Sequence, residues 1–355
     1  MGAILGIGLT HYPPLVHTDR NMAGPLKFIM RSPGLPEQYR HPENWPTPMR
    51  AEWGTDEGTS TAGRHREDLV AWFRKARQVL DDFAPDFIVI WGDDQYENFK
   101  EDVIPAFCVM AYDSISARPP WAESFGRMLG PNVWGEPDDK IFALQGHRAG
   151  AKHLTSGLLA EGFDIAYAYK PLHHPLGHAF LNAVLFLDYD RKGFHYPLVP
   201  CQINSYGRRV VVQRAGLPDL SNPPTEDTFD PPSPTPRRCF DLGAAAAGVL
   251  ARSPWRVALI ASSGWSHAFL TAKNHWLYPD IEADRRLYAA LRAGDYETWR
   301  NYPLAAIEDS GQQEVLNWCC LVGAMAELGR KPAESTLIET WVMNSNKCFA
   351  FFKPE

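Results

Sequence analysis

Three residues that can bind a metal or transfer protons stand next to predicted strands or helices. His11 follows an apolar run at 3–9, His267 follows one at 256–261, and Glu314 enters an apolar helix. Active sites of open α/β sheets gather where strands end, so both histidines occupy positions typical of an active site. Two neutral donors and one carboxylate leave coordination positions open, as in mononuclear non-haem Fe(II) oxygenases. Structural roles are also open: a capping histidine at His11 and an arginine partner for Glu314.

A second group of polar residues directly follows the buried run at 87–91. Within five positions the chain places Asp93, Asp94, Gln95 and Glu97. Carboxylates this close repel one another unless a cation or several hydrogen-bond donors offset their charge. The run therefore indicates either a divalent metal or a helix N-terminus with acidic caps, and both interpretations are open at this point.

Three histidines within six residues precede another apolar helix, at His173, His174 and His178. Adjacent residues point in different directions, so at most one of His173 and His174 shares a site with His178 unless the turn is tight. A cluster of this kind is more specific than a lone histidine, and surface or capping roles are expected for one or two of its members.

The elements that must position these residues alternate along the chain. Apolar runs predict strands at 3–9, 87–91, 104–111, 164–169, 196–203 and 256–261. Helical periodicity predicts helices at about 65–84, 144–161, 179–187, 239–251, 281–293 and 311–328. This order predicts a single α/β domain over 1–355, a sandwich with a central, mostly parallel or mixed sheet flanked by helices.

Two segments, 17–62 and 222–238, are rich in proline and show little periodicity. We expect 17–62 to be a long loop insertion that serves as a lid, a pocket wall or a partner surface. Its Trp45, Trp53 and Arg50 are candidates to cover an aromatic acid, with simple packing of the loop as the alternative.

Composition excludes several classes of protein. A content of 45% hydrophobic and 22% charged residues is typical of a globular chain. The net charge of -7, without a run of Lys or Arg, argues against nucleic-acid and membrane partners. No apolar stretch reaches a membrane span and no signal peptide is recognisable. Because the six cysteines form no CxxC pair and lie mostly in apolar runs, we expect reduced core cysteines and a cytoplasmic protein.

In its motifs and their order, the chain resembles the class III extradiol ring-cleaving dioxygenases, the family of the catalytic β subunit of protocatechuate 4,5-dioxygenase. The resemblance covers nearly the whole chain, and its order and spacing are more specific than any one motif. It is carried by Thr10-His11-Tyr-Pro, the strand and turn at 89–99, His174 ahead of an apolar helix, the run 238–243, Gly264-Trp-Ser-His267, Ser310-Gly-Gln-Gln-Glu314 and Asn344-Ser-Asn-Lys347.

The resemblance implies Fe(II) as cofactor and His11 and Glu314 as two of its ligands. The family pattern has Asp-His after the second strand, whereas this chain has Asp94-Gln95. Gln95 is therefore the expected third ligand, with Asp94 or Glu97 as alternatives, and loss of the metal is a further possibility. The Gly-Asp-Asp-Gln-x-Glu run is similar to that of methylgallate-type dioxygenases, which favours a working variant.

The same resemblance implies catalytic roles for two histidines. His267 is the expected acid and base, and His174 the second pocket histidine that orients substrate hydroxyls. His178 and Tyr206 are further candidates for binding the substrate. The implied reaction is extradiol cleavage of a catecholic aromatic, such as protocatechuate, gallate or a methylgallate-like compound, by dioxygen in aromatic degradation. A metal-free binding protein and a metallohydrolase are the alternatives.

Expected partners are a small aromatic substrate and dioxygen. We also expect a homodimer or higher homo-oligomer. The family's reference enzymes close their pocket partly with a small subunit or an attached segment. No such segment is recognisable at the C-terminal end of this sequence, so a separate small subunit is an open alternative.

Overall fold

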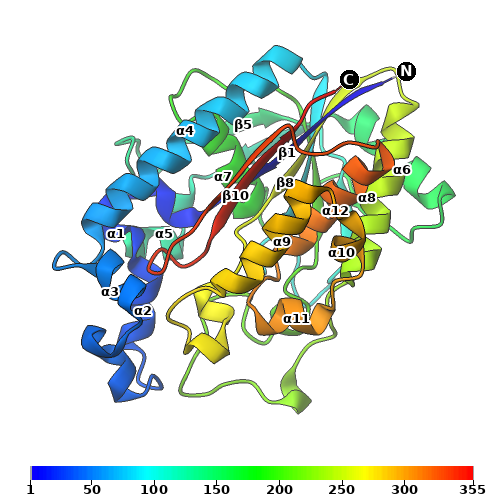
Figure 1. Ribbon diagram of the computed structural model, residues 1–355. Helices are drawn as coiled ribbons and strands as arrows, with labels where there is room; N and C mark the ends of the chain where they lie inside the picture. The colour runs from blue at the N-terminus through cyan, green and yellow to red at the C-terminus, as the bar shows by residue number, and fades with distance from the viewer. Residues whose placement is uncertain (1, 355) are drawn as a thin grey trace.

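The computed structural model describes residues 2–354, which form an α/β sandwich around one eight-stranded sheet (Figure 1). The strands follow the order β6-β3-β7-β2-β8-β1-β10-β9. They are β1 (Ala3–Leu9), β2 (Phe87–Asp93), β3 (Phe107–Met110), β6 (Ala166–Ala168), β7 (Leu198–Ile203), β8 (Arg256–Ser262), β9 (Glu334–Ile338) and β10 (Lys347–Phe352). The neighbours β7, β2, β8 and β1 pair in parallel, whereas β10 is antiparallel to β1 and β9, and β3 to β7. The predicted α/β class with a mixed, mostly parallel sheet is confirmed.

Helices cover both faces of the sheet. One face carries α4 (Thr59–Phe83) and α7 (His178–Leu187), and the other carries α6 (Arg148–Ala160), α8 (Pro236–Ala251), α9 (Ile281–Ala293), α10 (Tyr296–Arg300) and α12 (Val315–Glu327). Shorter elements complete the chain: α1 (Asp19–Met22), α2 (Gly24–Arg31), α3 (Thr47–Trp53), α5 (Ser124–Leu129), α11 (Leu304–Asp309) and the hairpin of β4 (Ser114–Ala117) and β5 (Phe142–Gln145). Among residues 2–354, no helix has the length and apolar character needed to cross a bilayer.

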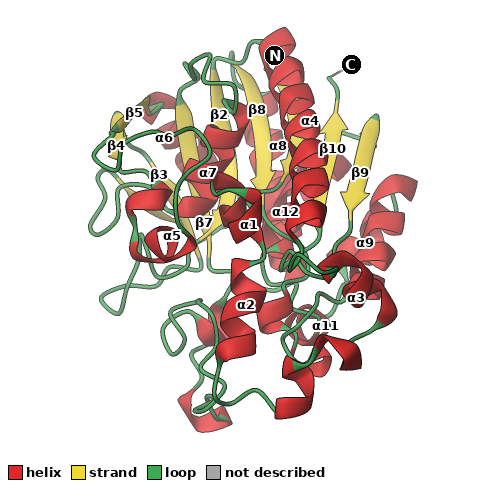
Figure 2. Cartoon of the chain, turned by 90° about the vertical axis from the view of Figure 1, so that its left-hand side faces the viewer, coloured by secondary structure: helices red, strands yellow, loops and turns green. Residues whose placement is uncertain are grey.

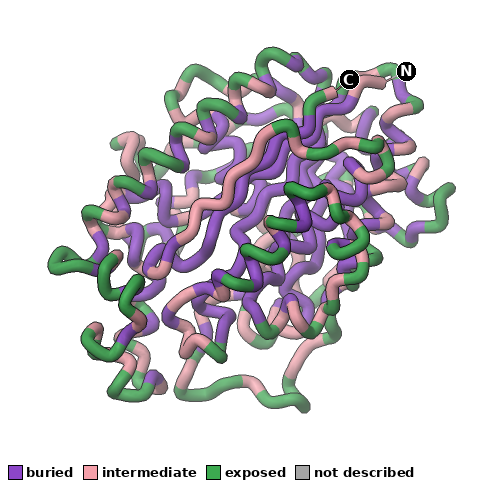
Figure 3. Tube along the Cα trace, in the orientation of Figure 1, coloured by how far each residue is buried: buried purple, intermediate pink, exposed green. Residues whose placement is uncertain are grey.

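The central strands separate two hydrophobic cores. On β2, Ile88 and Ile90 join the core beneath α4 and α7, whereas Phe87, Val89 and Trp91 join the core beneath α8 and α12. Successive side chains of a strand point to opposite faces, so a strand covered on both sides is apolar throughout. Figure 3 shows this as continuous burial along the middle of the sheet. All six cysteines are buried and unpaired, as expected.

The carboxyl ends of the parallel strands lie at one edge of the sheet. Leu9 at the end of β1 pairs with Ser262 at the end of β8, and β2 ends nearby at Asp93. In Figure 2 the helices α2, α3 and α11 gather beyond this edge. The residues that follow these strands are thereby brought together under a cover of short helices.

Every strand and helix predicted above is present, with ends that differ by a few residues. Four strands were not predicted, namely β4, β5, β9 and β10. The segment 17–62, expected as a loop, instead contains α1, α2 and α3 and the start of α4. Prolines at the first turns of α2 and α3 begin these helices rather than prevent them, because the first N–H groups of a helix need no partner within it.

Candidate metal centre

His11 lies two residues beyond β1 with its Nε2 free to bind a metal. Its Nδ1 is 3.1 Å from Ser262 Oγ, and that hydroxyl donates its own hydrogen to the carbonyl oxygen of Ala179 at 2.6 Å. The hydroxyl must therefore accept from His11, which places the ring hydrogen on Nδ1 and the lone pair on Nε2. Burial lowers the pKa of His11, and nearby histidines lower it further, so the ring is neutral.

His178, the first residue of α7, is oriented by Glu97. Its Nδ1 donates to Glu97 Oε2 at 2.8 Å, and its backbone N–H donates to the same carboxylate. This pairing leaves Nε2 of His178 available for a metal. The rings of His178 and His11 meet edge to face, with their centroids 5.0 Å apart. A carboxylate that fixes the far nitrogen is typical of metal-binding histidines. Burial opposes charge on His178, but Glu97, Asp93 and Glu314 together raise its pKa to about 9.

Two buried carboxylates face these imidazoles. Asp93 Oδ1 lies 3.9 Å from His11 Nε2 and accepts a hydrogen bond from Asn317, while its Oδ2 is buried without any partner. Glu314 Oε2 lies 3.4 Å from His11 Nε2 and accepts the Gly264 N–H at 2.7 Å. Burial raises the pKa of both acids, to about 7 for Glu314, and that of Asp93 rises further because Glu314 is its neighbour.

These residues fit a divalent cation. Ligand atoms of His11, Asp93 and His178 all lie within 4.8 Å of one another. Two ligands bound at roughly 2.1 Å and at right angles are about 3 Å apart, so small side-chain movements would close this set around one ion. Without a cation, the unpartnered Asp93 Oδ2 and the nearby buried carboxylate of Glu314 would destabilise the folded protein. Imidazole and carboxylate donors suit iron, zinc and similar metals.

Metal affinity should depend on pH through His178. An imidazolium cannot bind a metal, and the pKa of His178 is raised to about 9. Below that pH each bound ion must therefore release at least one proton, and below about pH 7 also protons from the carboxylates, because the pKa of Glu314 is raised to about 7. Affinity therefore rises at least about tenfold per pH unit until it levels off near pH 9. Calorimetric titration with Co(II) under argon between pH 6 and 9, in buffers of different ionisation enthalpy, measures both quantities. A flat profile without proton release would contradict this assignment.

The four polar residues of the acidic run after β2 have different roles. Asp94 accepts the backbone N–H groups of Glu97, Asn98 and Phe99, so it caps a turn. The helix N-terminus with acidic caps that the sequence left open does not form, because no helix lies between β2 and β3 in the described chain. Glu97 holds His178. Gln95 donates through Nε2 to Tyr206 Oη at 2.5 Å and to Glu314 Oε1 at 3.3 Å. Of the four, Asp93 alone has a fully buried oxygen without a hydrogen-bond partner.

Tyr206 acts on Glu314. Its hydroxyl donates to Glu314 Oε1 at 2.7 Å, and its side chain is buried beneath that carboxylate. Glu314 itself lies just before α12, whereas the sequence pattern placed it inside a helix. With Gln95, Tyr206 and the Gly264 N–H as donors, both oxygens of Glu314 are fixed in direction.

His267 lies on the other side of Glu314. Its Nε2 is 3.3 Å from Glu314 Oε1, and its backbone N–H donates to the carbonyl oxygen of Gly311 at 2.8 Å. A Cβ at position 264 would lie 2.7 Å from His267 Nε2, so glycine is required there. Burial, followed by the charge of Lys347, lowers the pKa of His267 to about 3, so the imidazole is uncharged and only weakly basic in this environment.

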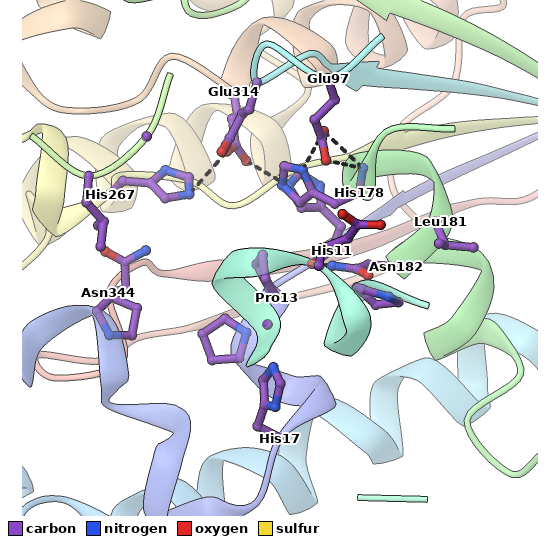
Figure 4. Close-up of a pocket in the computed structure, with 18 of the residues that line it drawn as sticks. His11, Pro13, His17, Glu97, His178, Leu181, Asn182, His267, Glu314 and Asn344 are labelled. Atoms are coloured by element: carbon purple, nitrogen blue, oxygen red, sulfur yellow. Dashed lines mark hydrogen bonds and ion pairs between the residues drawn. The ribbon is translucent and has the colours of Figure 1, made fainter. Parts of the chain in front are cut away.

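His11, His178, Glu97, Gln95, Glu314 and His267 line one cavity of about 290 Å³ (Figure 4), whereas Asp93 and Tyr206 are not among the residues that line it. In Figure 4, His267 and His178 stand on opposite sides with Glu314 between them. His174 lines the same cavity, whereas exposed His173 is paired with Asp102. The apolar side chains of the wall are those of Pro13, Pro14, Pro25, Pro120, Leu176, Leu181, Leu217 and Phe269. Such a cavity suits a flat aromatic ring held at one polar edge.

The sequence left several residues of the site unassigned. Asp93 stood out only as part of the acidic run, and the signal that could have distinguished it is the buried strand β2, which extends to Asp93. His17 and Arg118 line the cavity, and nothing in their local sequence indicated a site. Asn344 lines it too, and its run contributed to the resemblance without a role being assigned to it. Conversely, Trp45 and Trp53 pack against each other with centroids 5.4 Å apart rather than lining the cavity.

Comparison with known proteins agrees with this chemistry. A 2,3-dihydroxyphenylpropionate/2,3-dihydroxicinnamic acid 1,2-dioxygenase of Burkholderia vietnamiensis is 31% identical over 55% of this chain and 47% of its own length. A Rhodococcus sp. protein of the same name is 27% identical over 77% of this chain and 87% of its own. Gallate dioxygenase of Pseudomonas putida is 26% identical over 54% and 49%. No family model matches the chain.

The fold and the similarities together identify the chain as a distant homologue of ring-cleaving dioxygenases. More particularly, the relatives are extradiol dioxygenases, and the resemblance to class III of these enzymes is supported as distant homology. The chain spans about half the length of the first curated relatives it matches.

Proposed function

We propose that this protein is an Fe(II)-dependent extradiol dioxygenase that opens a catecholic ring with dioxygen in the degradation of aromatic compounds. One observation carries the proposal: the oriented imidazoles of His11 and His178 and the buried carboxylate of Glu314 line a cavity of aromatic size, and the buried carboxylate of Asp93 lies next to His11. Homologues that are ring-cleaving dioxygenases support it.

We assign the metal to His11, His178, Asp93 and Glu314. His178 takes the place of the family's second histidine ligand, and Gln95 becomes a donor that orients Glu314. Fe(II) bound there would act as a Lewis acid and electron-donating centre at which substrate oxygens and dioxygen are held together.

The protein's own residues supply proton transfer and positioning. Neutral His267 accepts a proton from a catechol hydroxyl at Nε2 and later returns it to the reacting oxygens. His174, which lines the same cavity, is assigned to a second substrate hydroxyl. The proline and leucine side chains exclude water around the ring, which strengthens these polar interactions.

A carboxylated catechol is the proposed substrate, in the range of protocatechuate, gallate, methylgallate-like compounds and dihydroxyphenylpropionate. Arg118 is the one lysine or arginine that lines the cavity, and it forms no ion pair among the described residues. The other charged groups of the wall are the carboxylates of Glu97, Glu123 and Glu314 and the imidazolium of His178, which Glu97 already holds. An arginine left unpaired beside them suits a substrate carboxylate, which it can hold with two parallel hydrogen bonds.

Replacing Arg118 by methionine should therefore raise KM for a carboxylated catechol about fivefold, as expected for an exposed ion pair, and leave kcat unchanged. Unsubstituted catechol is the matched control and should show the same KM in both proteins. Steady-state oxygen uptake measures both constants. An equal change for the two substrates would contradict the role of Arg118.

The activity itself is tested with protein loaded with Fe(II) under argon. We expect oxygen uptake and the ultraviolet spectrum of a ring-opened product with at least one of protocatechuate, gallate, methylgallate, homoprotocatechuate and 2-aminophenol. Elemental analysis should find iron bound. Protein without iron would indicate a binding protein, and bound metal without oxygen uptake would indicate a metallohydrolase. A cytoplasmic location and a homo-oligomeric state stay predictions, testable by fractionation and light scattering.

A further inference from the structure

A buried carboxylate outside the cavity connects the loops that carry the candidate catalytic groups. Asp284 lies on α9 with none of its surface exposed. It accepts the backbone N–H of Ser266 at 3.0 and 3.1 Å, the amide of Gln312 at 2.6 Å, and the amide of Asn346 at 2.8 Å. Its three partners belong to three separate loops, so one side chain joins segments that are distant in sequence.

Each of these loops delivers a residue to the cavity. Ser266 directly precedes His267, Gln312 stands two positions before Glu314, and Asn346 stands two positions after Asn344. A movement of any loop would therefore change the distance of 3.3 Å between His267 Nε2 and Glu314 Oε1 or the wall beside them.

Further hydrogen bonds connect the same loops, each bond joining two of the three. The N–H of His267 donates to Gly311, the N–H of Ala268 donates to Asn344 at 2.6 Å, and Ser266 Oγ donates to Ser310 at 2.5 Å. Loss of the Asp284 carboxylate would leave one backbone donor and two amides buried without their acceptor. The remaining bonds would then hold the loops only in pairs.

We infer that Asp284 is a positioning residue that sets the geometry of the His267–Glu314 pair by holding these three loops together. The inference rests on the proposed function, in which His267 moves protons beside Glu314. A displacement of about 1 Å in such a pair can cost about 100-fold in rate, even when the altered residue lies outside the cavity.

Asp284→Ala tests this inference by hydrogen exchange and by kinetics. Exchange should increase together in the segments 262–268, 310–314 and 344–346, and should stay unchanged in α4 and α7. With Fe(II) bound, kcat should fall about 100-fold while KM for the catechol and the Co(II) stoichiometry stay near those of the wild type. Asp295→Ala is the matched control, because this exposed aspartate caps α10 and contacts none of the three loops.

Asp284→Asn tests whether the hydrogen bonds of this side chain suffice without its negative charge. Its amide retains one acceptor, and Gln312 can turn its unpartnered Oε1 toward the new NH2 group, so most of the connection survives. We expect kcat within about tenfold of the wild type and nearly normal exchange in the three loops. If Asp284→Ala does not fold, the double variant Asp284→Asn with Gln312→Leu removes this compensation and should show both defects.

The inference is overturned if exchange increases in fewer than three loops or throughout the molecule, if kcat is unchanged despite loosened loops, or if Asp284→Asn is as impaired as the alanine variant. Absence of ring cleavage in the wild-type protein would refute the proposed function alone, because hydrogen exchange still decides whether Asp284 joins the loops.

Discussion

Replacing His178 by alanine should weaken Fe(II) or Co(II) binding more than about 100-fold and abolish ring cleavage. Loss of an outer partner of a metal ligand typically costs 10–100-fold, and loss of one of two imidazoles should cost more. The variant removes one of the three ligand atoms of His11, Asp93 and His178, which lie within 4.8 Å of one another. Anaerobic titration with Co(II), followed by its visible spectrum, measures the affinity without reference to activity.

Two variants serve as references for that result. His173→Ala alters an exposed histidine of the same segment, paired with Asp102, and should bind metal like the wild type. Glu97→Gln keeps His178 but weakens its orientation, so an intermediate loss of about 10–100-fold is expected. Metal retained by His178→Ala but lost by Gln95→Ala would show instead that Gln95 is the third ligand.

Replacing His267 by alanine should leave metal and substrate binding intact and lower turnover by about 100-fold or more. Proton transfer by a positioned group commonly contributes that much, and His267 approaches the centre only through Glu314. Anaerobic binding of the catechol, followed by single-turnover oxygen uptake, separates the two effects.

His275→Ala is the control for this experiment, since it removes a half-buried histidine that stacks on Tyr39 outside the cavity. It should retain normal turnover. Near-normal ring cleavage by His267→Ala would refute its role as acid and base, and loss of metal in that variant would make His267 a ligand instead.

The fold followed from the sequence because its signals are local. The buried runs of β1, β2 and β8 are apolar on both faces, and α9 shows clear helical periodicity between a capping aspartate and a glycine. The helices within 17–62 could not be predicted in this way. They are short, α2 and α3 begin at prolines, and their positions depend on tertiary packing, such as that of Trp45 on Trp53.

The candidate site was only partly predictable, because it depends on which residues meet in space. His11, Glu314 and His267 do lie together, as the resemblance implied. The partnership of His178 with Glu97 joins positions 81 residues apart, and no local pattern specifies it. Spacing could not separate Asp93 from Asp94 either, since one faces His11 and the other caps a turn.

The proposed ligands come from both faces of the sheet. His178 begins α7 in one hydrophobic core, and Glu314 precedes α12 in the other. A bound ion would therefore cross-link two layers that otherwise meet only through the strands between them. An ion that binds the folded chain alone, at 100 times its Kd, adds about 2.7 kcal/mol to the free energy of unfolding. The same four side chains would then both bind the iron and stabilise the packing of the two helical layers.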